Sequence, residues 1–152
     1  MPEPSRIRDI PEDQLTPEQA AVFRDLVAGR GRLLAPYRIW IHAPKFAAAM
    51  ETIGTYLNRK GSLSELEVEL AICIIANHWK GEYVWAAHVK MCRDLGYPQS
   101  VFDAIRAGQV PALENERERV VYDLAQISMQ PGGGSDEVFA RAEKLLGRNG
   151  IA

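Results

Sequence analysis

Cysteine is scarce in this chain, and no CxxC motif is present. Cys73 and Cys92 are the two cysteines among 152 residues, and they are far apart in sequence. Their separation matches neither a zinc-binding pattern nor a disulfide framework. We expect Cys73, inside an apolar run, to be a small buried core residue. For Cys92 we expect a half-exposed position on its helix and no role.

The chain also lacks a basic excess and a long apolar run. It has 18 Lys and Arg against 20 Asp and Glu, a net charge of −2. This balance argues against a nucleic-acid partner or an anionic membrane surface. No apolar run approaches the roughly 18 residues that a membrane span needs, and the first residues do not read as a signal peptide. We therefore expect a cytoplasmic protein without membrane contact.

Patterns for metal and nucleotide binding are missing as well. His42, His78 and His88 are not spaced as helical ligand pairs, and no acidic or cysteine cluster accompanies them. The glycine triplet at 132–134 does not follow a strand, so it is no phosphate-binding loop. We expect neither a metal nor a cofactor.

What the sequence does contain is helical periodicity. It predicts one all-α domain over 1–152, with an irregular arm at 1–15 and about seven helices. The predicted helices begin after Thr16, near Lys45, after Ser64, near Glu82, after Pro98, after Asn115 and after Ser135. Capping boxes are predicted at two of these starts, Thr16 with Gln19 and Ser64 with Glu67. The helix near Lys45 carries an apolar stripe at helical spacing, made of Phe46, Ala49, Met50, Ile53 and Leu57. They end at Gly29–Gly31, Leu57, His78, Leu95, Gly108, Pro131 and Gly147. The segment 35–44, which alternates briefly between prolines, is predicted to be an extended connector.

One carboxylate interrupts the most apolar of these helices. From Val68 to Ala76 the sequence is apolar on every side except at Glu69, which indicates a central, buried helix. A buried carboxylate must be paired or protonated, because burying it alone is costly. Glu69 can therefore serve proton transfer, or it can brace the helices through an arginine or a backbone donor.

The helix that follows carries the best general acid or base of the chain, His88, since histidine titrates in the physiological range. A lone histidine on an apolar face is, however, more often a core residue. Glu82 begins this helix, where a negative charge suits the helix dipole with or without a catalytic role. His78 ends the preceding helix and could line the same pocket or lie in solvent.

Aromatic residues surround this region. Trp79, Tyr83 and Trp85 can be core residues or the wall of a site, and the Tyr83 hydroxyl can donate to a bound carbonyl or carboxylate.

The stretch Trp79-Lys-Gly-Glu-Tyr83-Val-Trp85-Ala-Ala-His88 is similar to a W…Y-x-W-x-x-H element of the carboxymuconolactone decarboxylase family, which includes the alkylhydroperoxidase D-like proteins. Tyr37–Pro44, Glu69-Leu-Ala-Ile and Asp94-Leu-Gly-Tyr also resemble segments of this family, so that about residues 20–147 fit. The resemblance implies an orthogonal helix bundle and a homo-oligomer, commonly a trimer or hexamer. It also implies that His88 and Glu69 belong to one proton-relay site.

The chain departs from the family in three ways. Gly81 and Val84 stand where the peroxidase branch has its two cysteines, so a thiol peroxidase is not implied. Val84 also stands where the decarboxylase-like branch often has an acidic residue. Members of the family usually continue past Gly147 with one more apolar helix, whereas this sequence stops at Ala152. We expect that this helix is lost, that the chain is shortened, or that a neighbouring subunit fills its place.

These observations predict a cofactor-independent lyase, of the decarboxylase type, that acts by proton transfer on a small carboxylated or lactone-like substrate. The candidate catalytic residues are His88, Glu69 and Glu82. The candidate substrate-binding residues are His78, Trp79, Tyr83, Trp85 and, as a buried cation for a substrate carboxylate, Arg38. The alternative is a degenerate, non-catalytic member that acts through oligomerisation or ligand binding.

Overall fold

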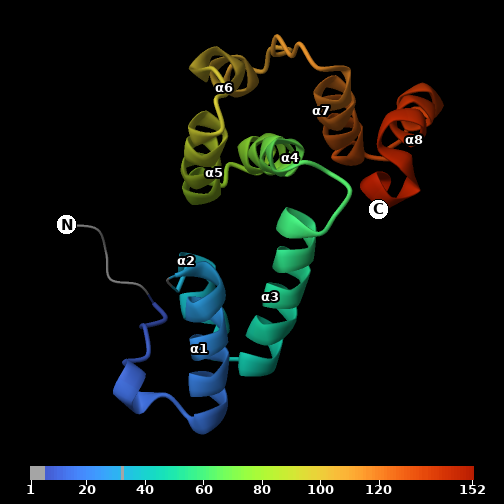
Figure 1. Ribbon diagram of the computed structural model, residues 1–152. Helices are drawn as coiled ribbons and strands as arrows, with labels where there is room; N and C mark the ends of the chain where they lie inside the picture. The colour runs from blue at the N-terminus through green and yellow to red at the C-terminus, as the bar shows by residue number, and fades with distance from the viewer. Residues whose placement is uncertain (1–5, 32) are drawn as a thin grey trace. The chain divides into compact units, whose positions relative to one another are not determined.

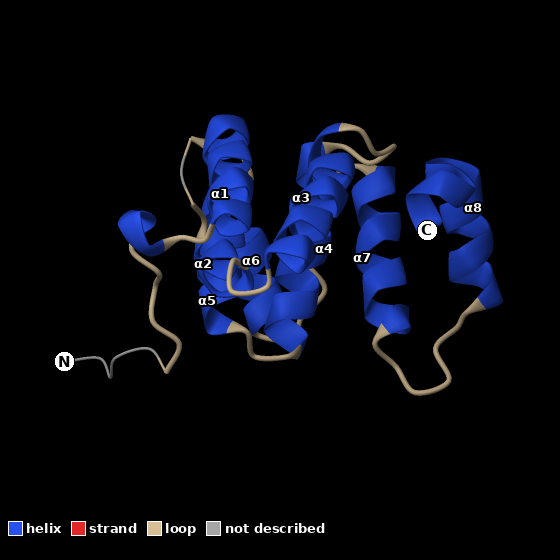
Figure 2. Ribbon diagram, turned by 90° about the horizontal axis from the view of Figure 1, so that it is seen from below, coloured by secondary structure: helices blue, strands red, loops and turns tan. Residues whose placement is uncertain are grey.

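The structure, a computed structural model, describes residues 6–31 and 33–152, and every regular element in these ranges is helical (Figure 2). The all-α prediction is therefore confirmed, although eight α-helices are present in these ranges where about seven were predicted. The elements are η1 (Glu12–Gln14), α1 (Pro17–Arg30), α2 (Ala35–Trp40), α3 (Pro44–Arg59), α4 (Glu65–His78), α5 (Glu82–Asp94), α6 (Gln99–Arg106), α7 (Glu116–Ser128) and α8 (Asp136–Ile151). The chain divides into two compact units, residues 1–56 and 57–152.

In the first unit, the predicted irregular arm contains the short 3-10 helix η1, and its residues 1–5 lie outside the described ranges. α1 begins at the predicted capping box, in which Thr16 and Gln19 bond each other's backbone N–H. It ends at Gly31, whose φ of 75° is the left-handed conformation that glycine adopts most readily. Leu26 of α1 packs in the core of this unit.

The prediction of an extended connector at 35–44 is wrong, because α2 occupies residues 35–40. Pro36 lies in the first turn, where proline's missing N–H costs no intrahelical hydrogen bond. Tyr37 and Ile41, one turn apart, are both buried. Burial of this pair on one face explains why the segment is helical despite its brief alternation of apolar and polar residues.

α3 was predicted as an amphipathic helix from Lys45 to Leu57, and a helix is present there. Its fully buried residue, however, is Ala47, on a different face from the predicted stripe. Phe46, Ile53 and Leu57 of the stripe are each about half exposed. The sequence pattern therefore marks a face of α3 that stays largely open in this chain.

In the second unit, α4 lies in the middle, with α5 and α6 on one side and α7 and α8 on the other (Figure 1). Its capping box is as predicted: Glu67 accepts from the Ser64 N–H at 2.8 Å, and Ser64 accepts from the Glu67 N–H at 3.2 Å. Leu70, Cys73 and Ile74 are buried, as expected for a central helix, whereas Ile75 is 42% exposed. α4 thus contributes to the cores on both of its sides.

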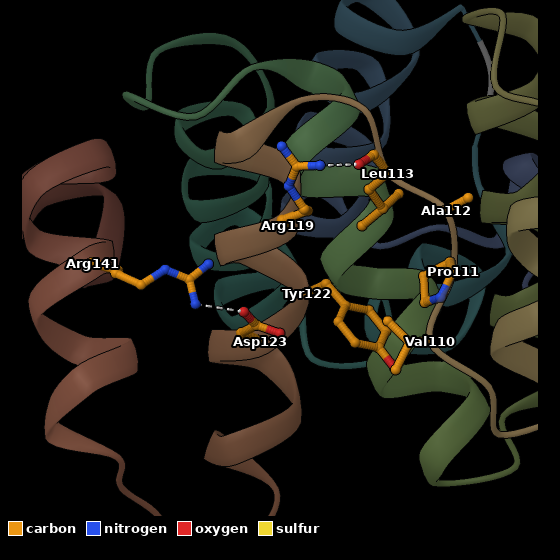
Figure 3. A pocket seen from close by; sticks show the side chains of 8 residues that line it. All are labelled: Val110, Pro111, Ala112, Leu113, Arg119, Tyr122, Asp123 and Arg141. Atoms are coloured by element: carbon orange, nitrogen blue, oxygen red, sulfur yellow. Dashed lines mark hydrogen bonds and ion pairs between the residues drawn. The ribbon is translucent and has the colours of Figure 1, made fainter.

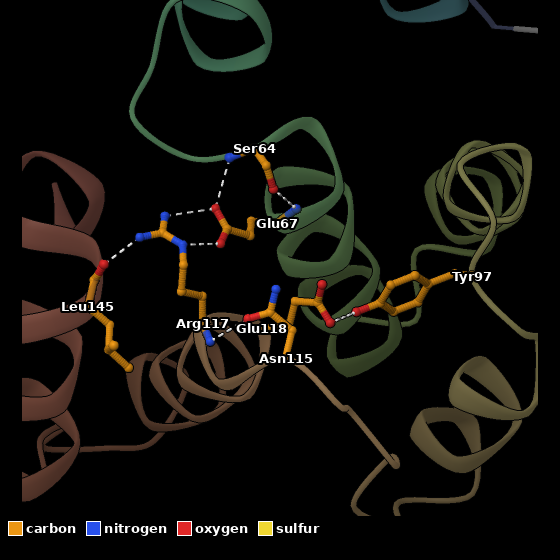
Figure 4. A network of polar contacts seen from close by, with 7 residues as sticks. All are labelled: Ser64, Glu67, Tyr97, Asn115, Arg117, Glu118 and Leu145. Atoms are coloured by element: carbon orange, nitrogen blue, oxygen red, sulfur yellow. Dashed lines mark hydrogen bonds and ion pairs between the residues drawn. The ribbon is translucent and has the colours of Figure 1, made fainter.

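An ion-pair network ties α4, α7 and α8 together (Figure 4). The guanidinium of Arg117 on α7 donates to both carboxylate oxygens of Glu67 on α4, at 2.6 and 3.1 Å, and to the backbone carbonyl of Leu145 on α8. Burial alone would raise the pKa of Glu67, but the hydrogen bonds from Arg117 and Ser64 outweigh it, so the pKa lies below its ordinary value. Glu67 is therefore a charged structural residue, and no sequence pattern had paired it with Arg117.

The last helix is interrupted at Gly147, where the sequence predicts that it ends. Gly147 has φ 68° and ψ 172°, which is not a helical conformation, so the regular helix stops there and a short helical stretch to Ile151 follows after a kink. Leu146 and Ile151, on the two sides of the kink, both pack in the core that α7 and α8 share.

Candidate functional site at the α4–α5 crossing

The structure brings together the two residues that the sequence had singled out first. Nδ1 of His88 on α5 lies 2.5 Å from Oε2 of Glu69 on α4. Glu69 is only 2% exposed, whereas the His88 side chain is 26% exposed. The partner that compensates the buried carboxylate is therefore a titratable imidazole and not an arginine.

This distance is that of a hydrogen bond, which needs one proton between the two atoms. In the arrangement in which Nδ1–H of His88 donates to the Glu69 carboxylate, the other ring nitrogen is left for further contacts. The remaining ring nitrogen, Nε2, has no hydrogen-bond partner among the described residues. In the neutral imidazole Nε2 is an acceptor, and in the protonated ring it is a donor, so this atom can take up or release a proton.

One helical turn beyond this pair on each helix are the two cysteines, Cys73 and Cys92, both free and completely buried. The expectation of a half-exposed Cys92 is therefore wrong, because its face of α5 packs in the same core as Cys73. A hydrogen bond with Cys92, together with burial, raises the pKa of the Cys73 thiol. Both thiols are part of the buried core that also contains Leu70 and Trp85.

Glu82 is not brought to His88. Its carboxylate forms a two-bond ion pair with Arg106 at the end of α6, at 3.0 and 2.6 Å. Six residues of α-helix, about 9 Å of rise, separate Glu82 from His88. The predicted catalytic role of Glu82 has no support in this arrangement, and nothing in the sequence had indicated Arg106 as its partner.

The predicted aromatic wall is only partly present. Trp85 is buried, packs edge-on against Phe102, and has the Arg106 guanidinium 4.5 Å above its ring. Trp79 and Tyr83, in contrast, are 72% and 65% exposed. These two side chains lie on the outer face of the α4–α5 hairpin and do not exclude water from the site within this chain.

The two remaining candidates are exposed. His78, at the end of α4, contacts the Trp79 ring edge-on, which agrees with the alternative of a helix-end histidine in solvent. Arg38 was expected to be a buried cation, and this is wrong: its side chain is 53% exposed and pairs with Asp9 at 2.6 Å within the first unit. An ion pair at the surface keeps both charges hydrated, which burial would not.

Two kinds of feature are absent from the described part of the chain. No group of three or more His, Cys, Asp and Glu residues has an arrangement that could hold a metal ion. None of the helices there combines the length and the apolarity needed to cross a bilayer. Comparison of the chain with family models, with curated proteins and with solved structures gave no match.

Proposed function

We propose that this protein is a cofactor-independent lyase of the decarboxylase type, which acts on a small carboxylated or lactone-like substrate with His88 as the proton-transfer group. The observation that carries the proposal is the 2.5 Å contact between the buried Glu69 carboxylate and Nδ1 of the partly exposed His88. The resemblance of residues 79–88 to the carboxymuconolactone decarboxylase family supports the substrate class.

In the proposed reaction, Glu69 is a positioning residue and His88 is the catalytic residue. The substrate carboxylate leaves as CO₂, and the bonding electron pair moves into the conjugated lactone. The protonated His88 then delivers a proton from Nε2 to the substrate carbon, while Glu69 stabilises the imidazolium through Nδ1. A buried carboxylate serves this purpose well, because little water competes for its hydrogen bond.

We do not propose a thiol peroxidase. Such an enzyme attacks peroxide with an accessible thiolate. Cys73 and Cys92 are completely buried, and the pKa of Cys73 is raised by its hydrogen bond with Cys92 and by burial. Both features disfavour the reactive thiolate.

We also propose that the chain forms a homo-oligomer, and this is the basis of the second candidate function, a non-catalytic assembly or binding protein. Tyr83, Val84 and Met91 of α5 and Leu95 directly after it are all between 39% and 65% exposed. Apolar side chains that gather on an exposed helix face are typical of protein–protein contacts. A second copy of the chain on this face would cover them and enclose the neighbouring His88.

The first test is release of CO₂ from γ-carboxymuconolactone. We expect the wild type to release it and His88→Ala to lose at least about 10²-fold in rate, the usual contribution of a general acid or base. Glu69→Gln should also lower the rate, because the amide stabilises an imidazolium less well. His42→Ala is the matched control, since His42 is bonded to the Arg8 carbonyl in the first unit.

Equal CO₂ release by the wild type and a folded His88→Ala would refute the role of His88. No release by a folded wild type would reject the decarboxylation of this substrate and favour the assembly function.

A further inference from the structure

A hollow in the second unit lies away from the α4–α5 crossing, and we propose that it binds a small carboxylate anion with an apolar body. The loop 110–113 after α6, three residues within about one turn of α7 and one residue of α8 line it (Figure 3). None of its lining residues belongs to α4 or α5. The proposal is therefore independent of the proposed lyase function.

The shape suits a small organic molecule. The hollow has a volume of about 290 Å³, near the lower end of the range for small-molecule sites. Pro111, Leu113 and Tyr122 are buried and supply an apolar floor, with the aromatic ring of Tyr122 among them. Val110 is 80% exposed at the edge, so a bound apolar group would remove it from water.

The charge of the hollow selects a monoanion. Arg119 and Arg141 contribute two positive charges and Asp123 one negative charge, so the three side chains leave a net charge of +1. A carboxylate of charge −1 neutralises this excess. A phosphate dianion would exceed it and would lie near the Asp123 carboxylate, which disfavours it.

Both arginines are held in place but retain donors. Nη1 of Arg119 donates to the Leu113 carbonyl at 2.8 Å, and Nη1 of Arg141 donates to Asp123 at 3.0 Å. A guanidinium carries five N–H groups, and neither arginine makes another hydrogen bond to the residues that the structure describes. Each arginine therefore presents further N–H groups without having to be ordered first, which lowers the entropic cost of binding.

The experiment is calorimetric titration of the full chain with benzoate, and with benzyl alcohol as its neutral counterpart. We expect saturable binding of one benzoate per chain and at least about tenfold weaker binding of benzyl alcohol, because a hydrogen bond to a charged group exceeds a neutral one. Arg119→Gln and Arg141→Gln should each weaken benzoate about tenfold. Arg148→Gln, which removes an exposed arginine paired with Glu143 on α8, should leave the affinity unchanged.

Four outcomes would overturn the proposal. Two concern the wild type alone: no saturable benzoate binding, or equal binding of benzyl alcohol. The third is unchanged affinity in the folded double variant Arg119→Gln/Arg141→Gln. The fourth is loss of benzoate binding in His88→Ala, which would place the ligand at the α4–α5 crossing.

Discussion

Two glutamates of α4 are close in sequence, nearly fully buried, and differ in what compensates their charge. Glu67 pairs with Arg117, and Glu69 pairs with His88. Residues two apart on a helix point to different faces, so Glu67 reaches α7 and Glu69 reaches α5. Arginine stays charged at any physiological pH, whereas histidine exchanges protons. The first pair therefore suits a structural role, and the second suits proton transfer.

The Glu67–Arg117 ion pair makes the free energy of unfolding depend on pH in the acid range. The pKa of Glu67 is lower in the folded protein than in the unfolded chain, where it is about 4.3, so the unfolded state binds the extra proton first. Its contribution is complete above about pH 4.3 and is lost as the pH falls toward the lowered pKa. We expect Glu67→Gln to lose about 2 kcal/mol of unfolding free energy at pH 7, and its stability to fall less than that of the wild type as the pH drops below about 4.3.

Urea unfolding of both proteins across this pH range measures the effect. Glu143→Gln is the control, because the Glu143–Arg148 pair is exposed at the surface of α8. Parallel loss of stability by the wild type and Glu67→Gln below pH 4.3 would contradict the prediction.

At the scale of helices, the boundaries follow local capping chemistry, while bends follow packing. Thr16, Ser64, Asn115 and Ser135 each accept a backbone N–H at the start of a helix, as their side chains predict. Gly147 is a stop signal of the same local kind, and its non-helical backbone does interrupt α8. A short helical stretch follows the kink, and the burial of Leu146 and Ile151 on its two sides accounts for that stretch.

The bend gives a prediction for α8. Gly147→Ala should lower the free energy of unfolding by about 1–2 kcal/mol. The φ of 68° at this position is a backbone conformation that a residue with a Cβ adopts only at such a cost. Steric room is not the reason, since a Cβ at this position would meet no atom within 4 Å. Gly134→Ala is the matched control: it has the same open space without a positive φ, so its unfolding free energy should not fall. Thermal unfolding of the two variants compares them directly, and equal melting temperatures would contradict the account.

At the scale of the whole molecule, the open apolar faces predict self-association. Met91, on the exposed face of α5, is 44% exposed, and a lysine there would place a charge inside the proposed contact. We expect the wild type to elute as an oligomer in size-exclusion chromatography with light scattering. Met91→Lys should shift it to smaller species without loss of helical circular dichroism.

Phe139→Lys is the control for self-association, because Phe139 is similarly exposed but lies on α8, away from the α5 face. A wild type that is monomeric at all concentrations would contradict the proposed oligomer. A shift caused equally by both variants would contradict its location on α5.

Much of the local structure was predictable because it depends on short-range chemistry. Capping residues and glycines determined most helix starts and ends, and periodicity identified α4 as central. The segment 35–40 escaped prediction because its helix depends on burial of Tyr37 among residues distant in sequence. The ion pairs that Arg106 and Arg117 form were not predicted for the same reason. An arginine carries no sequence signal for which distant carboxylate it will contact.

By itself, the sequence determined the helical class, most helix starts and the need for a partner to Glu69, because helix caps, apolar periodicity and the cost of a buried charge are local properties. The tertiary structure decided which partner that is. The packing of α4 against α5 places His88 beside Glu69, whereas the packing of α6 places Arg106 in an ion pair with Glu82. Pairing between distant residues depends on how helices pack, and no single helix carries that information.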